Sequence, residues 1–140
     1  MHEHEKYRHK DMYTRDGDGF IVQVSRHSVD ITDHPACFDS EGPHRWCIYA
    51  YIYPKHWHFG AFSGTDVFQD AASMMPLHCG PSLLRWHLGG EGEVTSVQVG
   101  CDYNHLHDNE YTRLGNPVEA FGVFSDADDL FNWLSRKEPQ

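Results

Sequence analysis

The segment that most constrains the fold is residues 45–53, which read Arg-Trp-Cys-Ile-Tyr-Ala-Tyr-Ile-Tyr. Aromatic and β-branched residues at this density favour a β-strand. An apolar character that is nearly continuous is typical of a central strand covered on one face and partly on the other. Because side chains alternate along a strand, we expect the three tyrosines on one face and Ile48, Ala50 and Ile52 on the other. Pro54 cannot donate to a β-ladder and therefore ends the strand.

Further strand patterns flank this segment. Residues 20–26, 82–88 and 94–101 are rich in β-branched or alternating apolar residues, and the glycine-rich turn 89–92 predicts an antiparallel hairpin between the last two. Residues 1–18 are polar and charged, so we interpret them as a flexible arm that precedes a single domain over residues 19–140.

Helical spacing of apolar residues follows a capping-box pattern that begins at Ser63 and predicts a helix over residues 63–75. Asn116 and Ser125 are two further helix starts, which leaves open whether the C-terminal segment forms one helix or two, and Leu130, Phe131 and Leu134 are expected to pack on the sheet. The predicted fold class is α+β, with an antiparallel sheet of about four to five strands and helices covering one face.

The chain carries 11 Lys and Arg against 21 Asp and Glu, a formal net charge of −10. This balance argues against direct nucleic-acid binding, which needs a basic surface. Two interpretations fit this net charge: an ordinary acidic surface, and an acidic face that docks on a basic partner. For the second interpretation we single out five acidic residues as the partner-binding set: Asp66, Asp70, Asp126, Asp128 and Asp129. The sequence shows neither a signal peptide nor an apolar run of about 18 residues, which predicts a cytoplasmic protein with reduced thiols and no membrane contact.

Titratable residues gather where the strand over residues 94–101 ends. If the end of strand 45–53 lies near this point, the sequence predicts a site for a divalent metal such as zinc made by His56, His78, Asp102, His105 and Asp108. Three alternatives stay open. Asp102 could fix the tautomer of His78 or His105 for acid–base chemistry. Asp102 and Asn104 could cap a turn while the histidines pack beside tryptophans. Zinc could instead take Cys79 and Cys101 with His78 and His105.

Three short motifs occur in order along the chain: residues 56–60, His-Trp-His-Phe-Gly; residues 78–80, His-Cys-Gly; and residues 100–108, which begin Gly-Cys-Asp and end in Asp108. Together they resemble the His-Pro-x-Tyr-Gly, His-Gly-Gly and Gly-Phe-Asp-x-x-His-x-x-Asp elements of a group of small uncharacterised phage and prophage proteins. The departures include Trp57 in place of proline and Cys79 in place of glycine, and they leave the five predicted ligands in matching places. The resemblance implies a mobile-genetic-element origin and no particular activity.

Two functions follow as hypotheses. The preferred one is a non-enzymatic inhibitor, of the anti-CRISPR or anti-restriction type, that binds a host protein or nucleoprotein complex with a basic surface in the host-cell cytoplasm and needs no cofactor. The alternative is a small metal-dependent hydrolase that uses the His/Asp cluster.

Overall fold

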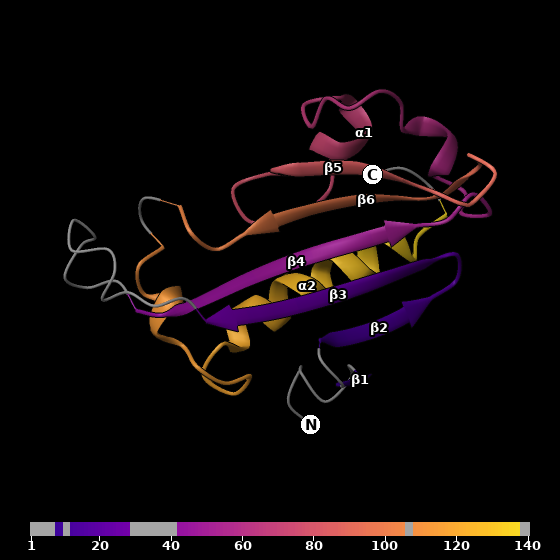
Figure 1. The fold of residues 1–140 in the computed structure, drawn as a ribbon. Helices are drawn as coiled ribbons and strands as arrows, with labels where there is room; N and C mark the ends of the chain where they lie inside the picture. Colours follow the sequence, from indigo (N-terminus) through magenta and orange to yellow (C-terminus); the bar gives the residue numbers. More distant parts are fainter. Residues whose placement is uncertain (1–7, 10–11, 29–41, 106–107, 138–140) are drawn as a thin grey trace.

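The computed structural model describes residues 8–9, 12–28, 42–105 and 108–137. Its centre is an antiparallel sheet of six strands in the order β1-β2-β3-β4-β6-β5 (Figure 1). The strands are β1 (Arg8–His9), β2 (Tyr13–Gly17), β3 (Phe20–Ser28), β4 (His44–Ile52), β5 (Leu83–Leu88) and β6 (Val94–Asp102). Two α-helices and two 3-10 turns complete the described elements: η3 (Phe59–Ala61), α1 (Asp70–Ser73), η4 (Tyr111–Arg113) and α2 (Phe121–Leu134). The predicted α+β class is confirmed, with more strands than expected.

Strand β4 is central, as predicted, and pairs with β3 on one side and β6 on the other. Ile48, Ala50 and Ile52 are fully buried, whereas Tyr49 and Tyr51 lie half-buried on the opposite face. The expected alternation is therefore confirmed for Tyr49 and Tyr51, whereas Tyr53 follows the end of the strand.

The β-hairpin formed by β2 and β3 corrects the expectation of a loose arm over residues 1–18. Residues 13–17 pair along their whole length with β3, from Tyr13 opposite Val24 to Gly17 opposite Phe20. One charged side chain of this segment has a partner on α2, since Arg15 donates to the Asp128 carboxylate at 2.9 Å. The rest of the predicted arm, apart from β1, Met12 and Asp18, lies outside the described residues.

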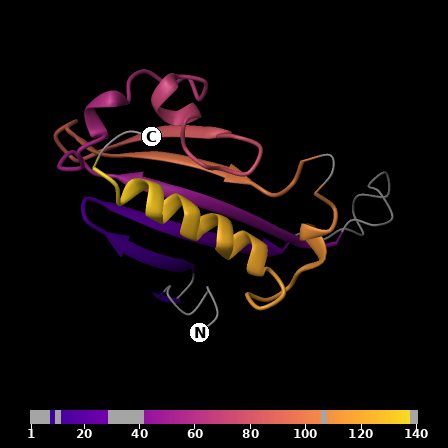
Figure 2. The same cartoon turned by 180° about the vertical axis from the view of Figure 1, so that it is seen from behind.

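Helix α2 covers one face of the sheet across β3 and β4 (Figure 2). Leu130 and Leu134 are fully buried, and the Phe131 ring lies 4.9 Å from that of Phe20, which confirms the predicted contact of this segment with the sheet. The segment forms one helix, so Ser125 is an internal residue rather than a cap. The predicted start at Asn116 is a turn before the helix, in which the Asn116 side chain accepts the Glu119 N–H at 2.9 Å.

The connection from β4 to β5 is mostly irregular, although a helix was expected over residues 63–75. Only Asp70–Ser73 is α-helical. The Asp66 carboxylate accepts the Phe68 N–H at 2.8 Å, and the Gln69 side-chain oxygen accepts the Ser63 N–H at 3.0 Å. Such local side-chain bonds compete with helical hydrogen bonding and hold this stretch as a loop.

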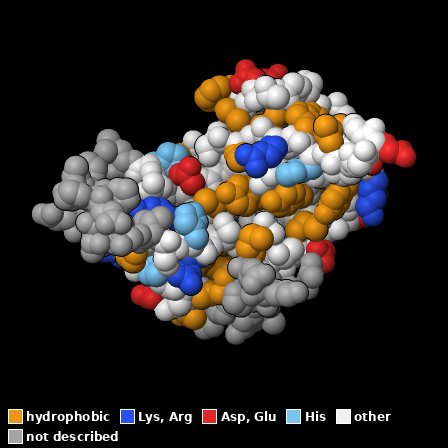
Figure 3. All heavy atoms as spheres, viewed as in Figure 1, with side chains coloured by type: hydrophobic (Ala, Val, Ile, Leu, Met, Phe, Trp, Pro, Cys, Tyr) orange, Lys and Arg blue, Asp and Glu red, His pale blue; other side chains and the backbone are white. Residues whose placement is uncertain are grey.

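The face that α2 leaves free carries hydrophobic side chains across its middle, with histidine and arginine around them (Figure 3). Tyr49 and Tyr51 from β4 and Leu83 from β5 lie on it half-buried, next to the polar Gln98 of β6.

Candidate metal centre

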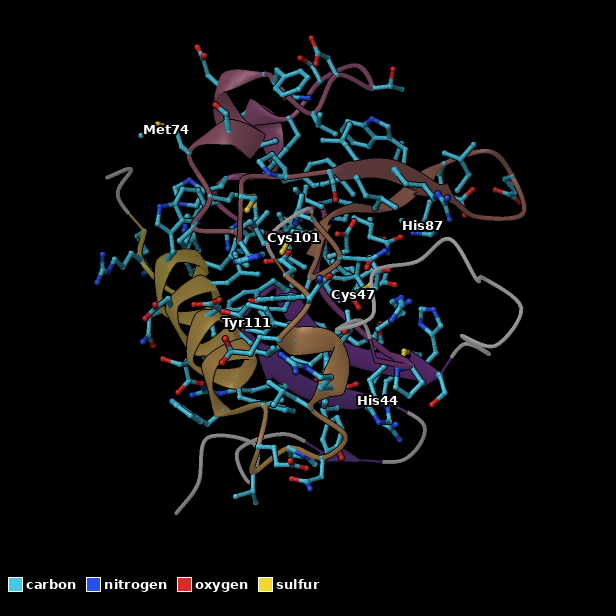
Figure 4. All side chains as sticks on the ribbon, turned by 90° about the vertical axis from the view of Figure 1, so that its left-hand side faces the viewer. His44, Cys47, Met74, His87, Cys101 and Tyr111 are labelled. Atoms are coloured by element: carbon cyan, nitrogen blue, oxygen red, sulfur yellow. The ribbon has the colours of Figure 1, made fainter. Side chains whose placement is uncertain are left out.

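The candidate site lies at the end of the sheet where β6 ends and β5 begins. Antiparallel pairing sets Leu83 opposite Gly100, so the turn before β5 and the loop after β6 are neighbours. These segments carry His78 and Cys79 on one side and Asp102, His105 and Asp108 on the other. Figure 4 views this end of the molecule, with Cys101 of β6 above Tyr111 of η4.

Asp108 is the hub of the cluster. Its carboxylate is buried and accepts hydrogen bonds from His78 Nε2 at 2.9 Å and from His105 Nδ1 at 2.8 Å. It also accepts the backbone N–H of His105 at 2.9 Å. Burial alone raises the pKa of this carboxyl, but the hydrogen bonds from His105 and His78 outweigh burial and hold the pKa below its usual value. Asp108 is therefore an ionised carboxylate that orients both imidazoles.

The His78 ring is fixed by aromatic neighbours. It stacks on Tyr103 with ring centroids 4.3 Å apart and planes 13° from parallel, and it meets the Tyr111 ring edge-on at 5.4 Å. Tyr103 is fully buried and donates its hydroxyl to Asp126 at 2.5 Å. Burial, the main cause, and the bond to Asp126 both raise the pKa of Tyr103. The tyrosine is neutral and serves as a rigid wall.

Cys79 brings a thiol sulfur close to the two imidazoles. One nitrogen from each of His78 and His105 and the Cys79 sulfur all lie within 4.8 Å of one another. Cys79 is exposed and has a φ of 58°, the only positive φ of a residue other than glycine in the described part of the chain. A left-handed conformation costs of order 1–3 kcal/mol for such a residue and is commonly found at functional sites.

The structure brings together four of the five predicted metal ligands, His78, Asp102, His105 and Asp108. Asp102 stands at the margin, 3.7 Å from His105 Nδ1, and caps a turn by accepting the Asn104 N–H at 3.1 Å. Both the cluster and the predicted turn cap are thus present. The acid–base alternative fits less well, because Asp108, rather than Asp102, holds the imidazoles.

His56 does not belong to the site, and its prediction as a ligand is wrong. Antiparallel pairing sets Ile52 opposite Val97 and Cys47 opposite Asp102, so the end of β4 lies far along the sheet from the end of β6. His56 is buried there; its Nε2–H donates to Leu134 O at 2.9 Å and its Nδ1 accepts the His58 N–H at 3.0 Å. Both ring nitrogens are used, which makes this histidine structural.

The alternative zinc set, in which both Cys79 and Cys101 are ligands, is also wrong. Cys101 is buried on the core side of β6, and burial, the main cause, raises the pKa of its thiol to about 12. A protonated, enclosed thiol is a poor ligand. The sequence did single out His78, Cys79 and His105 within that set, but it gave no sign that the buried Tyr103 supports them.

The predicted partner-binding acids do not form one free surface. Asp126 accepts the Tyr103 hydroxyl, and Asp128 pairs with Arg15 at 2.9 Å. Both carboxylates are therefore used inside the fold. The other three of the set, Asp66, Asp70 and Asp129, are exposed, but they lie on separate segments, the β4–β5 connection and α2.

Comparison of the chain with known protein families, with curated proteins and with solved structures gives no match. The resemblance to phage proteins stays a prediction. Over the described residues, the structure contains no helix with the length and apolar character needed to cross a bilayer.

Proposed function

We propose that this protein binds a divalent transition metal, zinc first among them, through His78, Cys79 and His105. The observation that carries the proposal is the convergence of two imidazoles and one thiol within 4.8 Å. Zinc prefers imidazole nitrogen and thiolate sulfur as ligands. Sets made mainly of sulfur also suit Cu(I), and sets made of oxygen suit Mg²⁺ and Ca²⁺.

The environment of the ligands supports the proposal. Asp108 accepts a hydrogen bond from one ring nitrogen of each imidazole, His78 Nε2 and His105 Nδ1. A carboxylate behind a ligating histidine fixes its tautomer and makes it a stronger ligand. In this site one buried carboxylate, Asp108, orients two histidines. Histidines that merely lie together on a solvated surface do not need a shared buried partner.

Three protein ligands leave a fourth position open, which is the arrangement of catalytic rather than structural zinc sites. When bound, such an ion supplies a polarised water for hydrolysis. Asp102, whose carboxylate stands beside His105, is placed to accept a proton there. It also lines a hollow of about 190 Å³ on the open face of the sheet, with Tyr49 and Ser82 among the other walls. We therefore assign the site to the class of small metal-dependent hydrolases.

Metal binding tests the proposal directly. The protein, stripped with a chelator, should take up one equivalent of Zn²⁺ by calorimetry, and Co²⁺ should give the near-ultraviolet absorption band of a thiolate ligand. Cys79→Ala should abolish that band and weaken Zn²⁺ binding without unfolding the chain, because Cys79 is exposed. Cys47→Ser is the matched control, since Cys47 is a free thiol outside the cluster. Equal Zn²⁺ affinity in both variants would contradict the assignment.

The inhibitor hypothesis stands as a second proposal, supported by the net charge of −10 and by the exposed acids Asp66 and Asp129. The partner would be a basic host complex that handles nucleic acid, met in the host-cell cytoplasm. Charged residues at the rim of a protein–protein interface act mainly on the association rate. An Asp66→Asn, Asp129→Asn double variant should slow capture of such a complex and flatten its salt dependence, whereas Cys79→Ala should leave capture unchanged.

A further inference from the structure

A second hollow, of about 280 Å³, lies where η3, α1 and the C-terminal end of α2 meet. Its apolar wall includes Phe62, Ala71 and Met74, and Trp133 of α2 closes one side. Figure 4 shows Met74 on the α1 side of this region, above α2. The hollow is at the end of the sheet where β4 ends, so it is separate from the metal centre at the other end.

The aromatic side of the hollow is held in place. His58 stacks on Trp133 with ring centroids 5.3 Å apart and planes 29° from parallel. The same imidazole donates its Nε2–H to Arg136 O at 3.1 Å, which ties it to the residues after α2. Phe62 is almost completely buried, whereas Met74 is 57% exposed and stands at the rim. A fixed indole and an exposed, flexible thioether therefore both line the hollow.

One lining residue carries a fixed charge, and it is negative. Asp70 lies in the first turn of α1, is exposed, and lines the hollow beside Ala71 and Met74. The combination of an acid with Trp133 and apolar side chains favours a ligand that has both a positive charge and an apolar part. A tryptophan attracts cations through its ring electrons, and methionine adapts its shape to an apolar ligand.

We propose that this hollow binds a small organic cation, in which an ammonium group is carried on an aromatic or alkyl body. Asp70 pairs with the ammonium while Phe62, Met74 and Trp133 enclose the body. The volume is just below the usual range for ligand pockets, roughly 300–1,000 Å³, which fits a small molecule rather than a peptide segment. This site is independent of the proposed metal-dependent activity.

Three probes of one shape test the charge requirement: phenethylammonium, the neutral 2-phenylethanol and the anionic 3-phenylpropanoate. Titration followed by calorimetry and by tryptophan fluorescence should rank the ammonium first, the alcohol at least several-fold weaker, and the carboxylate without measurable binding. Equal binding of all three, or no binding of the ammonium, would overturn the proposal.

Two variants locate the site. Asp70→Asn should lower phenethylammonium affinity to that of 2-phenylethanol, while Asp129→Asn, which removes an exposed acid from the α2 surface outside the hollow, should leave it unchanged. Trp133→Leu should weaken both probes, with circular dichroism used to confirm that the fold persists. If Asp70→Asn and Asp129→Asn behave alike, the cation is bound elsewhere and the assignment is wrong.

Discussion

His56 and His78 show how differently one residue type is used in this chain. His78 lies against Tyr103 and donates to Asp108, whereas His56 donates to the carbonyl of Leu134, 78 residues away in the sequence. The sequence motif predicted His78, Asp102, His105 and Asp108 together because three of them lie within one loop. It could not predict that backbone groups of α2 and its own loop would satisfy both nitrogens of His56.

His56 makes stability depend on pH. Burial, the main cause, lowers the pKa of this imidazole in the folded state, although the bond to Leu134 O partly opposes it. The unfolded chain, with a histidine pKa of about 6.5, then binds the proton more readily than the folded chain. The stabilisation is complete above about pH 6.5 and is lost as the pH falls from there toward the lower folded pKa. Urea unfolding measured at about pH 7.5 and pH 5 gives the free energy of unfolding at each pH. This free energy should decrease less between the two pH values for His56→Gln than for the parent. An unchanged decrease would contradict this role.

Asp108→Asn should destabilise the fold by about 1–3 kcal/mol, because the amide nitrogen would face the donors that the carboxylate now accepts. The cost is independent of metal and is measured by urea unfolding in the presence of a chelator. Asp102→Asn is the control: Asp102 is more exposed and its contact with the Asn104 N–H can be kept by an amide oxygen, so the change should stay within about 0.5 kcal/mol. Equal losses in both variants would show that Asp108 is not the hub.

The two predicted helices had different outcomes. The C-terminal pattern was correct in its buried face but not in its start, because Ser125 fits equally well as an exposed helix residue and as a cap. Over residues 63–75 the capping-box spacing was present, yet Asp66 and Gln69 bond to Phe68 and Ser63 and only four residues are helical. Local spacing alone does not show which of these competing hydrogen bonds form.

Leu134→Ala should cost about 2–5 kcal/mol, the range for truncating a buried leucine. Leu134 is fully buried at the last turn of α2, and its carbonyl also accepts the His56 bond. Asn132→Ala, at an exposed position of the same helix, should change stability by less than about 0.5 kcal/mol. Thermal or urea unfolding of the pair checks the contribution of this helix. Equal small effects would mean that α2 contributes little to the core.

Gly122→Ala should stabilise the protein by about 0.5–1 kcal/mol, since glycine is costly inside a helix. Gly122 lies in the first turns of α2, and a Cβ built there meets no atom within 4 Å. Gly64→Ala is a matched contrast: its Cβ would also meet nothing, but its φ of +61° disfavours alanine. The two substitutions should shift the unfolding midpoint in opposite directions, and a shared sign would contradict the argument.

At the scale of the whole molecule, pairings between segments far apart in sequence decide where the chemistry lies. The hairpin of β5 and β6 was predictable from a glycine-rich turn between two strand patterns. The pairing of β4 with β6 was not, because 41 residues separate Ile52 from Val94 and no local signal sets their register. That register places the end of β4 and the end of β6 at opposite ends of the sheet, and so divides the predicted ligands between the candidate metal centre and a structural contact.

The net charge of −10 predicts that added salt stabilises the folded state at neutral pH. Folding gathers like charges, and their mutual repulsion weakens as the Debye length falls from about 30 Å at 0.01 M salt to about 8 Å at 0.15 M. If screening removes about 1 kcal/mol of repulsion, Tm should rise by roughly 2–4 °C for a chain of this size. Sodium chloride and potassium chloride should act equally, since the effect is one of ionic strength and not of a specific cation. Salt also weakens attractive pairs, of which Arg15 with Asp128 is half-buried and at 2.9 Å. Arg15→Gln removes this attractive pair and should therefore enlarge the rise in Tm with salt. A Tm that falls with salt in both the parent and the variant would show that ion pairs, rather than net repulsion, dominate the electrostatics of this fold.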